Sequence, residues 1–506
     1  MTRRPLLLAV ALLCAALAAP AAPAGAATHP LVTAVAEPFV DGGDYPVMLK
    51  RMRGAGATAT RFWVTWADIA PAGAVRPAGF DAADPADPAY RWEATDRALR
   101  AVRAAGLEPI MTISEAPAWA ERYAAGDESL PASERWQGTV RPDAAEFALF
   151  AKAITTRYGG SFQGLPRVRW WQPWNEPNHH NDLNPQFHVA PGQFATATTP
   201  LASPAIYREL LQGFARTAHA VRADNVVVAG GLAPFFRPSP GGRASAPLTF
   251  ARELLCMDAR NRPKASCPGG PLEFDAWSQH PYTSGDARHS ANSPYDVSLG
   301  DMGEVVRLVR AAQRAGRIKA RRAVRMWVTE FSWDSSPPDP YGVPSRLLTR
   351  WVAEALHELY DDGVELVTWF QIRDAVAPPQ GVFQSGLYLR CAGGLACDRP
   401  KPMLAAFRFP LTAYRRAGRV SVWGRTPGGR AGIVAVQQRR GRRWMQIARL
   451  RADRNGIFQR SRVRPKGTGD IRARLLRSTH TSPAFSLRRV PDRAVNPFGN
   501  SPVDEQ

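Results

Sequence analysis

The chain has 506 residues, of which 45% are hydrophobic and 22% are charged, a balance that excludes a wholly disordered protein. Its net charge of +21 would point to nucleic acid or an acidic surface if it were evenly spread, but it is not. Between residues 411 and 490, 20 arginines and Lys466 stand against two acidic residues, Asp453 and Asp470. The longer part of the chain before residue 411 is therefore nearly neutral.

The start of the chain has the order of a secretory signal. Two arginines, Arg3 and Arg4, precede an apolar run over residues 6–19, and small residues follow it. The run is shorter than the ~20 apolar residues that a spanning helix needs, and an uncleaved anchor is the alternative. We expect residues 1–27 to be a cleaved signal peptide. The mature protein would then be secreted into the extracellular space, with no membrane span.

The cysteines are consistent with secretion. Cleavage removes Cys14 and leaves four cysteines, an even number in an oxidising compartment. Their spacing predicts two local disulfides, Cys256–Cys267 and Cys391–Cys397. A metal site built from the same four is disfavoured, because neither pair has CxxC spacing and no histidine lies beside them at ligand spacing.

From residue 30 to about 410, short β-branched or aromatic runs alternate with longer amphipathic runs. Apolar residues recur at spacings of three and four over residues 147–158 and 207–218, which gives each helix one buried face. Eight such units favour a closed (β/α)8 TIM barrel over residues 28–410, and no GxGxxG follows the first strand to suggest a dinucleotide-binding sheet. The strand candidates are 31–36, 58–64, 107–113, 167–174, 225–231, 273–280, 324–329 and 364–370.

After residue 418 the pattern changes to short alternating runs separated by turn residues. This pattern predicts a small all-β sandwich, which makes residues 411–490 a basic C-terminal domain. We expect the proline-containing residues 491–506 to be a flexible tail. The strand candidates in this domain are 420–423, 433–436, 444–450, 456–458 and 471–475.

Two glutamates follow predicted barrel strands in tryptophan-rich surroundings. The fourth strand ends in Trp174-Asn175-Glu176-Pro177, and the seventh ends in Thr329-Glu330. In a barrel, the carboxyl ends of the strands surround one mouth, where active sites are built. Cleavage of a glycosidic bond needs two carboxyl groups there, one to protonate the departing oxygen and one to attack or stabilise the anomeric carbon. Indoles also provide flat apolar surfaces on which sugars stack.

With these motifs the sequence resembles the retaining glycoside hydrolases of clan A, over roughly residues 31–410. In that clan the acid/base lies in an Asn-Glu-Pro motif after strand four, and the nucleophile is a glutamate after strand seven. The resemblance implies that Glu176 is the general acid/base, that Glu330 is the nucleophile and that Asn175 faces the sugar 2-hydroxyl. It implies no metal or other cofactor. Families 5 and 39 are the most similar, and the motifs do not separate them.

Further residues match the same pattern. Arg61 after strand two resembles the arginine that supports the nucleophile, and His280 and Tyr282 after strand six resemble the His-x-Tyr element. Trp369 after strand eight resembles the platform on which the sugar lies. All four would then contact the substrate or the nucleophile at the barrel mouth.

Other polar residues near the strand ends offer different interpretations. Glu37 and Glu115 also follow predicted strands, but lie in no comparable motif, so substrate contacts or loop ion pairs are favoured. His179 and His180 look like metal ligands, yet adjacent residues of a strand point to opposite faces, which favours a loop or subsite role.

The function hypothesis is a secreted retaining glycosidase acting on a β-linked polysaccharide or oligosaccharide, expected to be monomeric. A catalytically silent, carbohydrate-binding barrel that serves as an adhesin is the competing class, and a transglycosylase using the same glutamates is the third. For the basic C-terminal domain, a solvated surface ranks before a clamp on an acidic wall polymer or polysaccharide. Nucleic acid ranks last, because no recognition helix or stacking motif is present.

Overall fold

The computed structural model describes residues 29–37, 44–123, 136–188, 195–196, 198–236, 244–376 and 383–496. The predicted signal peptide, residues 1–27, lies outside this part of the chain. Within the described residues, none of the helices combines the length and the apolar character needed to cross a bilayer.

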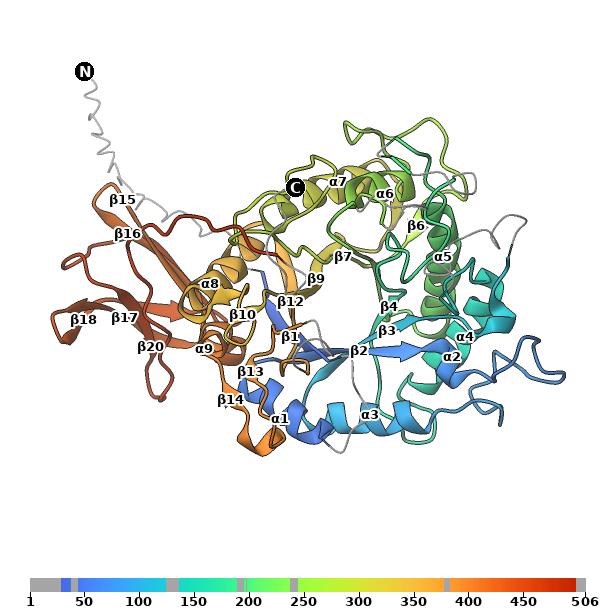
Figure 1. Ribbon diagram of the computed structural model, residues 1–506, viewed down its shortest axis with the longest axis horizontal. Helices are drawn as coiled ribbons and strands as arrows, with labels where there is room; N and C mark the ends of the chain where they lie inside the picture. Colours follow the sequence, from blue (N-terminus) through green and yellow to red (C-terminus); the bar gives the residue numbers. More distant parts are fainter. Residues whose placement is uncertain are drawn as a thin grey trace, which may run out of the picture.

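Eight parallel strands form a closed barrel, which confirms the predicted fold class (Figure 1). Around the barrel the order is β1-β12-β9-β7-β5-β4-β3-β2, so each barrel strand pairs with its neighbours in the chain and the last pairs with the first. All eight predicted strands are present within a few residues. They are β1 (Val32–Ala36), β2 (Ala59–Thr65), β3 (Glu108–Ser114), β4 (Trp170–Pro173), β5 (Val226–Leu232), β7 (Ala276–Gln279), β9 (Arg325–Phe331) and β12 (Val364–Phe370).

Helices surround the barrel and bury one face each against it (Figure 1). In the helix after β3, the Asp143 carboxylate accepts hydrogen bonds from the first backbone N–H groups, and the buried residues Phe147, Phe150 and Ile154 follow at helical spacing. The helices are α1 (Tyr45–Gly54), α2 (Trp66–Ile69), α3 (Glu93–Ala104), α4 (Ala144–Arg157), α5 (Ser203–Val221), α6 (Pro247–Leu254), α7 (Met302–Arg314), α8 (Ser345–Asp361) and α9 (Pro402–Arg408).

The interior of the barrel changes from apolar to polar toward the carboxyl ends of the strands. One layer of inward side chains is apolar and includes Ala59, Ile110, Ala276 and Trp327. Because alternate residues of a strand point to the same side, the next inward residues are two positions further along. These next residues are Arg61, Thr112, Ser278 and Thr329, all buried. The sequence therefore places a buried polar layer directly beneath the barrel mouth.

Six strands of the C-terminal region form two three-stranded antiparallel sheets around a shared core, as predicted for a small β-sandwich. The strands are β15 (Leu411–Arg416), β16 (Arg419–Arg425), β17 (Gly432–Arg440), β18 (Arg443–Ala452), β19 (Ile457–Val463) and β20 (Ile471–Leu475). The sheet β15-β16-β19 packs on α8, where the Trp423 ring stacks on His357 with 4.7 Å between centroids. The sheet β18-β17-β20 forms the other layer (Figure 1).

Two local differences from the sequence analysis concern the C-terminal region. Strand β15 was not predicted, because its first residues are buried on both faces and so show no alternation. Residues 491–496 do not behave as the expected flexible tail: Val495 is buried and donates its N–H to the carbonyl of Ser284, and Asp492 pairs with His289 at 2.7 Å. Residues 497–506 lie outside the described chain.

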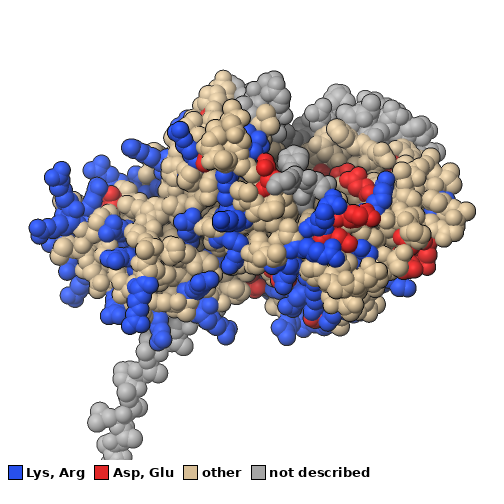
Figure 2. Space-filling view, turned by 90° about the horizontal axis from the view of Figure 1, so that it is seen from below, with Lys and Arg blue, Asp and Glu red and all other residues tan. Residues whose placement is uncertain are grey.

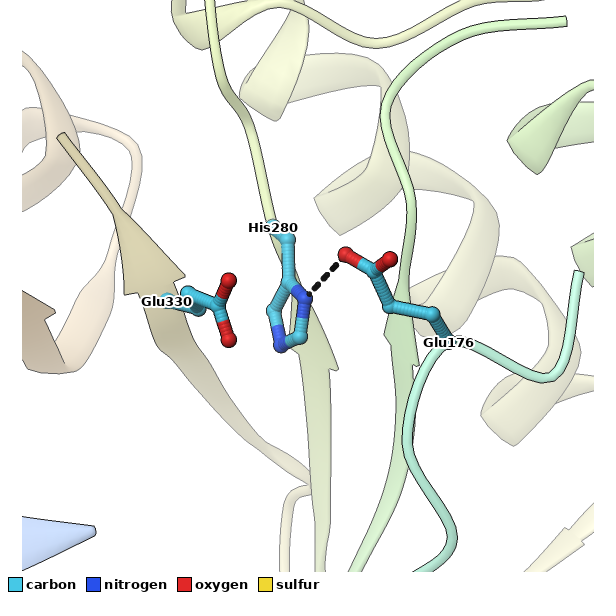
Figure 3. A group of neighbouring side chains, drawn as sticks. All are labelled: Glu176, His280 and Glu330. Atoms are coloured by element: carbon cyan, nitrogen blue, oxygen red, sulfur yellow. Dashed lines mark hydrogen bonds and ion pairs between the residues drawn. The ribbon is translucent and has the colours of Figure 1, made fainter. Parts of the chain in front are cut away.

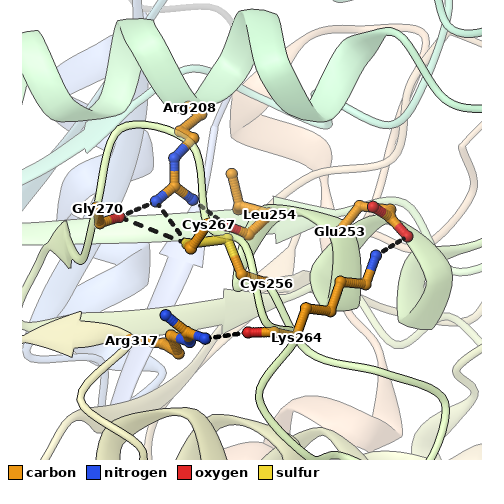
Figure 4. The surroundings of a disulfide bond; sticks show 8 residues. All are labelled: Arg208, Glu253, Leu254, Cys256, Lys264, Cys267, Gly270 and Arg317. Atoms are coloured by element: carbon orange, nitrogen blue, oxygen red, sulfur yellow. Dashed lines mark hydrogen bonds and ion pairs between the residues drawn. A yellow bond between two sulfur atoms is a disulfide. The ribbon is translucent and has the colours of Figure 1, made fainter.

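Both predicted disulfides, Cys256–Cys267 and Cys391–Cys397, are present. The first joins α6 to the loop that leads toward β7 (Figure 4). Arg208 donates to the carbonyls of Leu254 and Gly270 on either side of it. The described residues also form three short two-stranded sheets: β6 (Leu272–Glu273) with β8 (Ile318–Lys319), β10 (Ser335–Ser336) with β11 (Val343–Pro344), and β13 (Tyr388–Leu389) with β14 (Arg399–Pro400).

Candidate active site

The two predicted catalytic glutamates face one another across the barrel mouth. Glu176 follows β4 and Glu330 is the residue before the last of β9, and in Figure 3 both carboxylates point toward the space beside His280. One carboxylate oxygen of each lies within 4.8 Å of the other. Glu330 is 9% exposed and Glu176 is partly buried. Two carboxyl groups from strands that are far apart in the sequence therefore share one cavity.

A bulge in β9 directs Glu330 into the barrel. The register of β9 against β12 shifts between the pairs formed by Val328 and Phe331, so β9 carries an extra residue there. Strict alternation would point Thr329 inward and Glu330 outward. With the bulge, both Thr329 and Glu330 contact groups inside the barrel, and Phe331 joins the core outside it.

Each oxygen of the Glu330 carboxylate has its own donor. The Arg61 guanidinium donates to Oε2 at 2.6 Å, and the Tyr282 hydroxyl donates to Oε1 at 2.8 Å. Burial lowers the pKa of Arg61, and the Glu330 charge opposes that effect. Burial and the same negative charge raise the pKa of Tyr282, so its hydroxyl keeps its proton. Both oxygens of Glu330 are therefore held by donors inside the barrel.

Glu176 has a different partner, a neutral histidine. Nδ1 of His280 lies 2.8 Å from Oε1 of Glu176, and Nε2 lies 3.0 Å from the Thr329 hydroxyl oxygen. Burial lowers the pKa of His280 to about 3, so the ring is uncharged at neutral pH. A neutral imidazole has one donor and one acceptor nitrogen, and the Thr329 hydroxyl can take either complementary role. His280 can therefore hold Glu176 in its protonated or its ionised form.

The backbone around Glu176 is unusual. Trp174 and Glu176 both have positive φ angles, 74° and 31°, which side-chain-bearing residues adopt rarely and mostly at functional sites. The Glu176 N–H donates to the carbonyl of Gly231 at 3.1 Å. Gly231 itself has φ +68°, and a Cβ there would lie 2.5 Å from the Gln172 amide nitrogen. The absence of a side chain at Gly231 thus leaves room for the Gln172 side chain of β4.

Asn175 bridges Arg61 and an acid that the sequence analysis did not identify. Its Oδ1 accepts from Arg61 at 2.6 Å, and its Nδ2 donates to Asp182 at 2.8 Å. Burial and the Glu176 charge raise the pKa of Asp182. Asp182 lies in the loop six residues after Glu176, where no periodicity or motif marks it. Its proximity to the site depends on how that loop folds back.

Trp369 is placed differently from the predicted sugar platform. Its side chain is 0% exposed, its indole N–H donates to the carbonyl of Ser385, and its ring packs against Phe331 and Trp333. A ring with no exposed face cannot stack on a sugar. Trp63 is partly exposed and lies over the Arg61 guanidinium, 4.2 Å from the ring centroid. Sequence position alone does not separate these two indoles.

The remaining residues singled out from the sequence lie near the mouth. Glu37 is buried, and its N–H donates to the carbonyl of Arg61. Glu115 is exposed and has φ +59°. His179 and His180 lie in the loop after Glu176, with their ring centroids 4.5 Å apart.

Among the residues that the structure describes, two side-chain groups have the composition of a metal site: Glu176 with His280 and Glu330, and Glu176 with His179 and Asp182. In the first group, the Arg61 guanidinium already supplies a positive charge at 2.6 Å from Glu330. A cation bound there would have to displace that guanidinium or be repelled by it. The second group shares Glu176 with the first.

No family model matches the chain, and no curated protein is similar to it in sequence. It is similar in structure to a family 39 glycoside hydrolase from Bacteroides cellulosilyticus, with a TM-score of 0.50 and 15% identity over 86% of this chain and 79% of that one. It also aligns with a family 39 enzyme from Xanthomonas axonopodis (TM-score 0.49, 16% identity, 86% and 95% covered). A third is a monomeric beta-xylosidase from Caulobacter crescentus (TM-score 0.49, 15% identity, 81% and 84% covered). At these identities the likeness establishes the fold.

Proposed function

We propose that the protein is a retaining glycoside hydrolase of clan A that cleaves a β-linked polysaccharide or oligosaccharide. The observation that carries this proposal is that one carboxylate oxygen of Glu176 and one of Glu330 lie within 4.8 Å of each other. A separation of ~5 to 5.5 Å between carboxyl groups suits double displacement, whereas ~6.5 to 9.5 Å leaves room for an inverting water. The similarity to family 39 enzymes in fold adds support but does not define a substrate.

In the first step, Glu330 attacks the anomeric carbon while the bond to the leaving oxygen breaks. Its carboxylate is held by Arg61 and Tyr282, which fix both oxygens and leave the attacking one oriented. Bond formation removes the negative charge of Glu330. The two donors therefore orient the nucleophile before the attack and stabilise the charge that returns to it as the leaving group in the second step.

Glu176 would carry the proton in both steps. It gives its proton to the departing glycosidic oxygen and later takes one from the water that attacks the glycosyl-enzyme. His280 accepts from protonated Glu176 through Nδ1 in one tautomer and donates to ionised Glu176 in the other. The Thr329 hydroxyl accepts a hydrogen bond from Nε2 in the first tautomer and donates one to Nε2 in the second. Thr329 also lies 2.5 Å from the Ser278 hydroxyl, which extends the chain of hydrogen bonds.

Substrate contacts follow from the remaining groups. Asn175 Nδ2 has two N–H bonds, and one of them donates to Asp182, so the other is available for the sugar 2-hydroxyl. The partly exposed ring of Trp63 replaces Trp369 as the platform at the mouth. The identity of the sugar depends on the long loops after the strands, and the site geometry does not specify it.

The decisive experiment replaces each glutamate and offers a small nucleophile. Glu330→Gly should abolish hydrolysis of an aryl β-glycoside, and azide should restore turnover with inverted product configuration. Glu176→Ala should be rescued by azide with retained configuration. Glu115→Gly is the matched control, because Glu115 also follows a barrel strand and has a positive φ that glycine tolerates.

Three outcomes discriminate the hypotheses. If Glu330→Gly hydrolyses as well as the parent protein, the nucleophile assignment is wrong. If the parent protein binds neutral glycans but turns over none of a broad panel of aryl glycosides, the silent carbohydrate-binding barrel replaces the enzyme. If oligosaccharide products longer than the substrate accumulate, transglycosylation with the same two glutamates replaces hydrolysis.

Secretion and a monomeric state complete the proposal. Secretion rests on the signal-like order of residues 1–27 and on the two disulfides, which suit an oxidising compartment. The monomeric state stays a prediction. Secretion would make polymers outside the cell the accessible substrates.

A further inference from the structure

The outer sheet of the C-terminal domain presents arginines in an ordered pattern. Residues of β17 alternate between the sandwich core, where Val434 and Val436 are buried, and the opposite face. The register places Arg449 of β18 and Arg474 of β20 on either side of Ala435 on that opposite face. The neighbouring rows of the same face are Arg451 beside Ile433, Gln446 and Arg472 beside Gln437, and Trp444 beside Arg439.

We call this set of side chains the arginine trough: a column of Arg449 and Arg451 on β18, a column of Arg472 and Arg474 on β20, and the uncharged Ile433, Ala435 and Gln437 of β17 between them. Neighbouring strands lie ~4.8 Å apart, so the two arginine columns stand ~10 Å apart at their backbones. Within a column, residues two apart are separated by ~7 Å. A single extended chain fits between such columns.

The charges of the trough are not balanced by acids of the same surface. Arg449, Arg451 and Arg474 are exposed, and within the described residues none of them has an acidic side chain within 4 Å. Asp470, at the edge of this sheet, pairs with Arg439 instead. Burial and, to a smaller extent, the nearby Arg474 charge lower the pKa of Arg472.

Solvated protein surfaces mix charges of both signs, whereas a large field of one sign attracts ligands of the opposite sign. Figure 2 shows Lys and Arg gathered over one end of the molecule with little Asp or Glu among them, and more acidic residues near the opposite end. Residues 411–490 account for most of this excess, with 21 basic and two acidic residues. The charge pattern therefore points to a polyanionic ligand.

We propose that the arginine trough binds a linear acidic polysaccharide through its carboxylate groups. Guanidinium groups pair with carboxylates in a bidentate manner, and two columns can hold acidic groups that project to both sides of one chain. Single-stranded nucleic acid would need exposed aromatic rings for its bases. In the trough rows, one face of the Trp444 ring is covered by the Arg472 guanidinium at 4.2 Å. The choice of a glycan over other polyanions also rests on the proposed function of the barrel.

The test measures binding with the full chain carrying Glu330→Gln, so that no polymer is consumed. The probes are polygalacturonate, neutral dextran of similar length and single-stranded poly(dT). The trough variant is Arg449→Gln/Arg451→Gln/Arg474→Gln. The matched control is Arg416→Gln/Arg460→Gln/Arg462→Gln, which removes the same charge from exposed positions of the other sheet.

Polygalacturonate should bind and dextran should not. The trough variant should bind polygalacturonate about tenfold more weakly at low salt, and the slope of log K against log salt should fall by about one to two. The control variant should stay within about threefold of the parent, because it changes net charge but not the trough.

Equal loss in both variants would overturn the proposal in favour of a diffuse basic surface, and no binding by the parent would overturn it as well. Tighter binding of poly(dT) than of polygalacturonate would replace the glycan by nucleic acid. These outcomes are separate from the proposed function, because binding is measured without hydrolysis and the catalytic test uses neutral aryl glycosides.

Discussion

Arg61 in the barrel mouth and Arg449 on the outer sheet show two opposite ways in which this chain uses the same side chain. Arg61 is 0% exposed and donates to Glu330, Asn175 and Thr112. Arg449 is exposed on a face that also carries Arg439, Arg451, Arg472 and Arg474. The Arg61 guanidinium finds its hydrogen-bond and charge partners inside the protein, whereas the Arg449 guanidinium is hydrated by solvent.

The difference follows from the cost of burying charge. A guanidinium removed from water must regain its lost interactions from a carboxylate and other acceptors, so the barrel places charges in pairs and stays nearly neutral. An exposed guanidinium keeps its water, so like charges can accumulate on the outer sheet at little cost to folding. Paired charges are thus available for chemistry at a fixed point, and unpaired charges for a ligand from outside.

Arg61→Met should cause the largest loss. It leaves Glu330 buried without its closest counter-charge, which should reduce the free energy of unfolding by about 3 to 5 kcal/mol. It should also lower kcat by about 100-fold or more, because the nucleophile loses a charged donor. Chemical unfolding and aryl-glycoside kinetics measure the two effects.

Arg157→Met is the matched control for that experiment. Arg157 is also buried and pairs with the Asp96 carboxylate at 2.7 Å, but both lie in the helical layer outside the site. It should lose comparable stability and keep kcat in the fraction that remains folded. If Arg61→Met lowers the stability but leaves kcat unchanged, Arg61 has a structural role and its pairing with Glu330 is not part of catalysis.

Tyr282→Phe should be the next most severe for activity. It removes one hydrogen bond to a charged carboxylate and almost no volume, so kcat should fall by about 10- to 100-fold. Tyr158→Phe removes an equivalent hydroxyl, which donates to Asp96 at 2.9 Å outside the site. Steady-state kinetics of both variants on one aryl glycoside should show a loss of kcat for Tyr282 alone. Equal kcat values for the two variants would mean that the Tyr282 hydroxyl does not support Glu330.

Asp334→Asn tests a buried charge that is only partly matched. Burial and the charges of Asp339 and Asp374 raise the pKa of Asp334 to about 7, although Lys401 opposes this. Because the folded pKa lies above the unfolded value, the folded state favours the protonated acid, and that stability is lost as the pH rises from about 4 through 7. Asp334→Asn cannot ionise. It should therefore be more stable relative to the parent at pH 8 than at pH 5, by on the order of 2 kcal/mol.

Asp398→Asn tests a carboxyl group whose pKa is shifted in the opposite direction. Its carboxylate pairs with Arg51 and Arg373, each at 2.7 Å, and these hydrogen bonds lower the pKa of Asp398. The stability that it contributes is present above the unfolded pKa and is lost as the pH falls through the folded one. Asp398→Asn should thus destabilise the protein at both pH 5 and pH 8. Chemical unfolding at the two pH values compares the variants, and identical pH dependence in both would refute the assignment for Asp334.

The barrel could be predicted from the sequence because its signals are local and repeated. Each strand is a short buried run and each helix a periodic one, so eight units defined the closed sheet without tertiary information. Glu176 and Glu330 were identified through motifs, and their approach within 4.8 Å follows from the barrel topology.

Features that depend on tertiary geometry could not be predicted in the same way. The β9 bulge that turns Glu330 inward has no glycine or other local marker, and Asp182 reaches Asn175 only after its loop folds back. Trp369 and Trp63 both lie close to strand ends, but packing buries the first and leaves the second partly open. Burial of Val495 likewise depends on a contact with a distant loop at Ser284.

Arg449→Gln should have the smallest effect and is the direct counterpart of Arg61→Met. No acidic side chain of the described chain lies within 4 Å of Arg449, so its removal breaks no ion pair and relieves a little repulsion from Arg474 across the sheet. The free energy of unfolding should change by less than about 0.5 kcal/mol, with a slight gain at low salt that disappears at high salt. Chemical unfolding at two ionic strengths measures this. A loss above about 1 kcal/mol would show that the outer sheet, like the barrel mouth, depends on its guanidinium groups for folding, and the contrast between the two regions would fail.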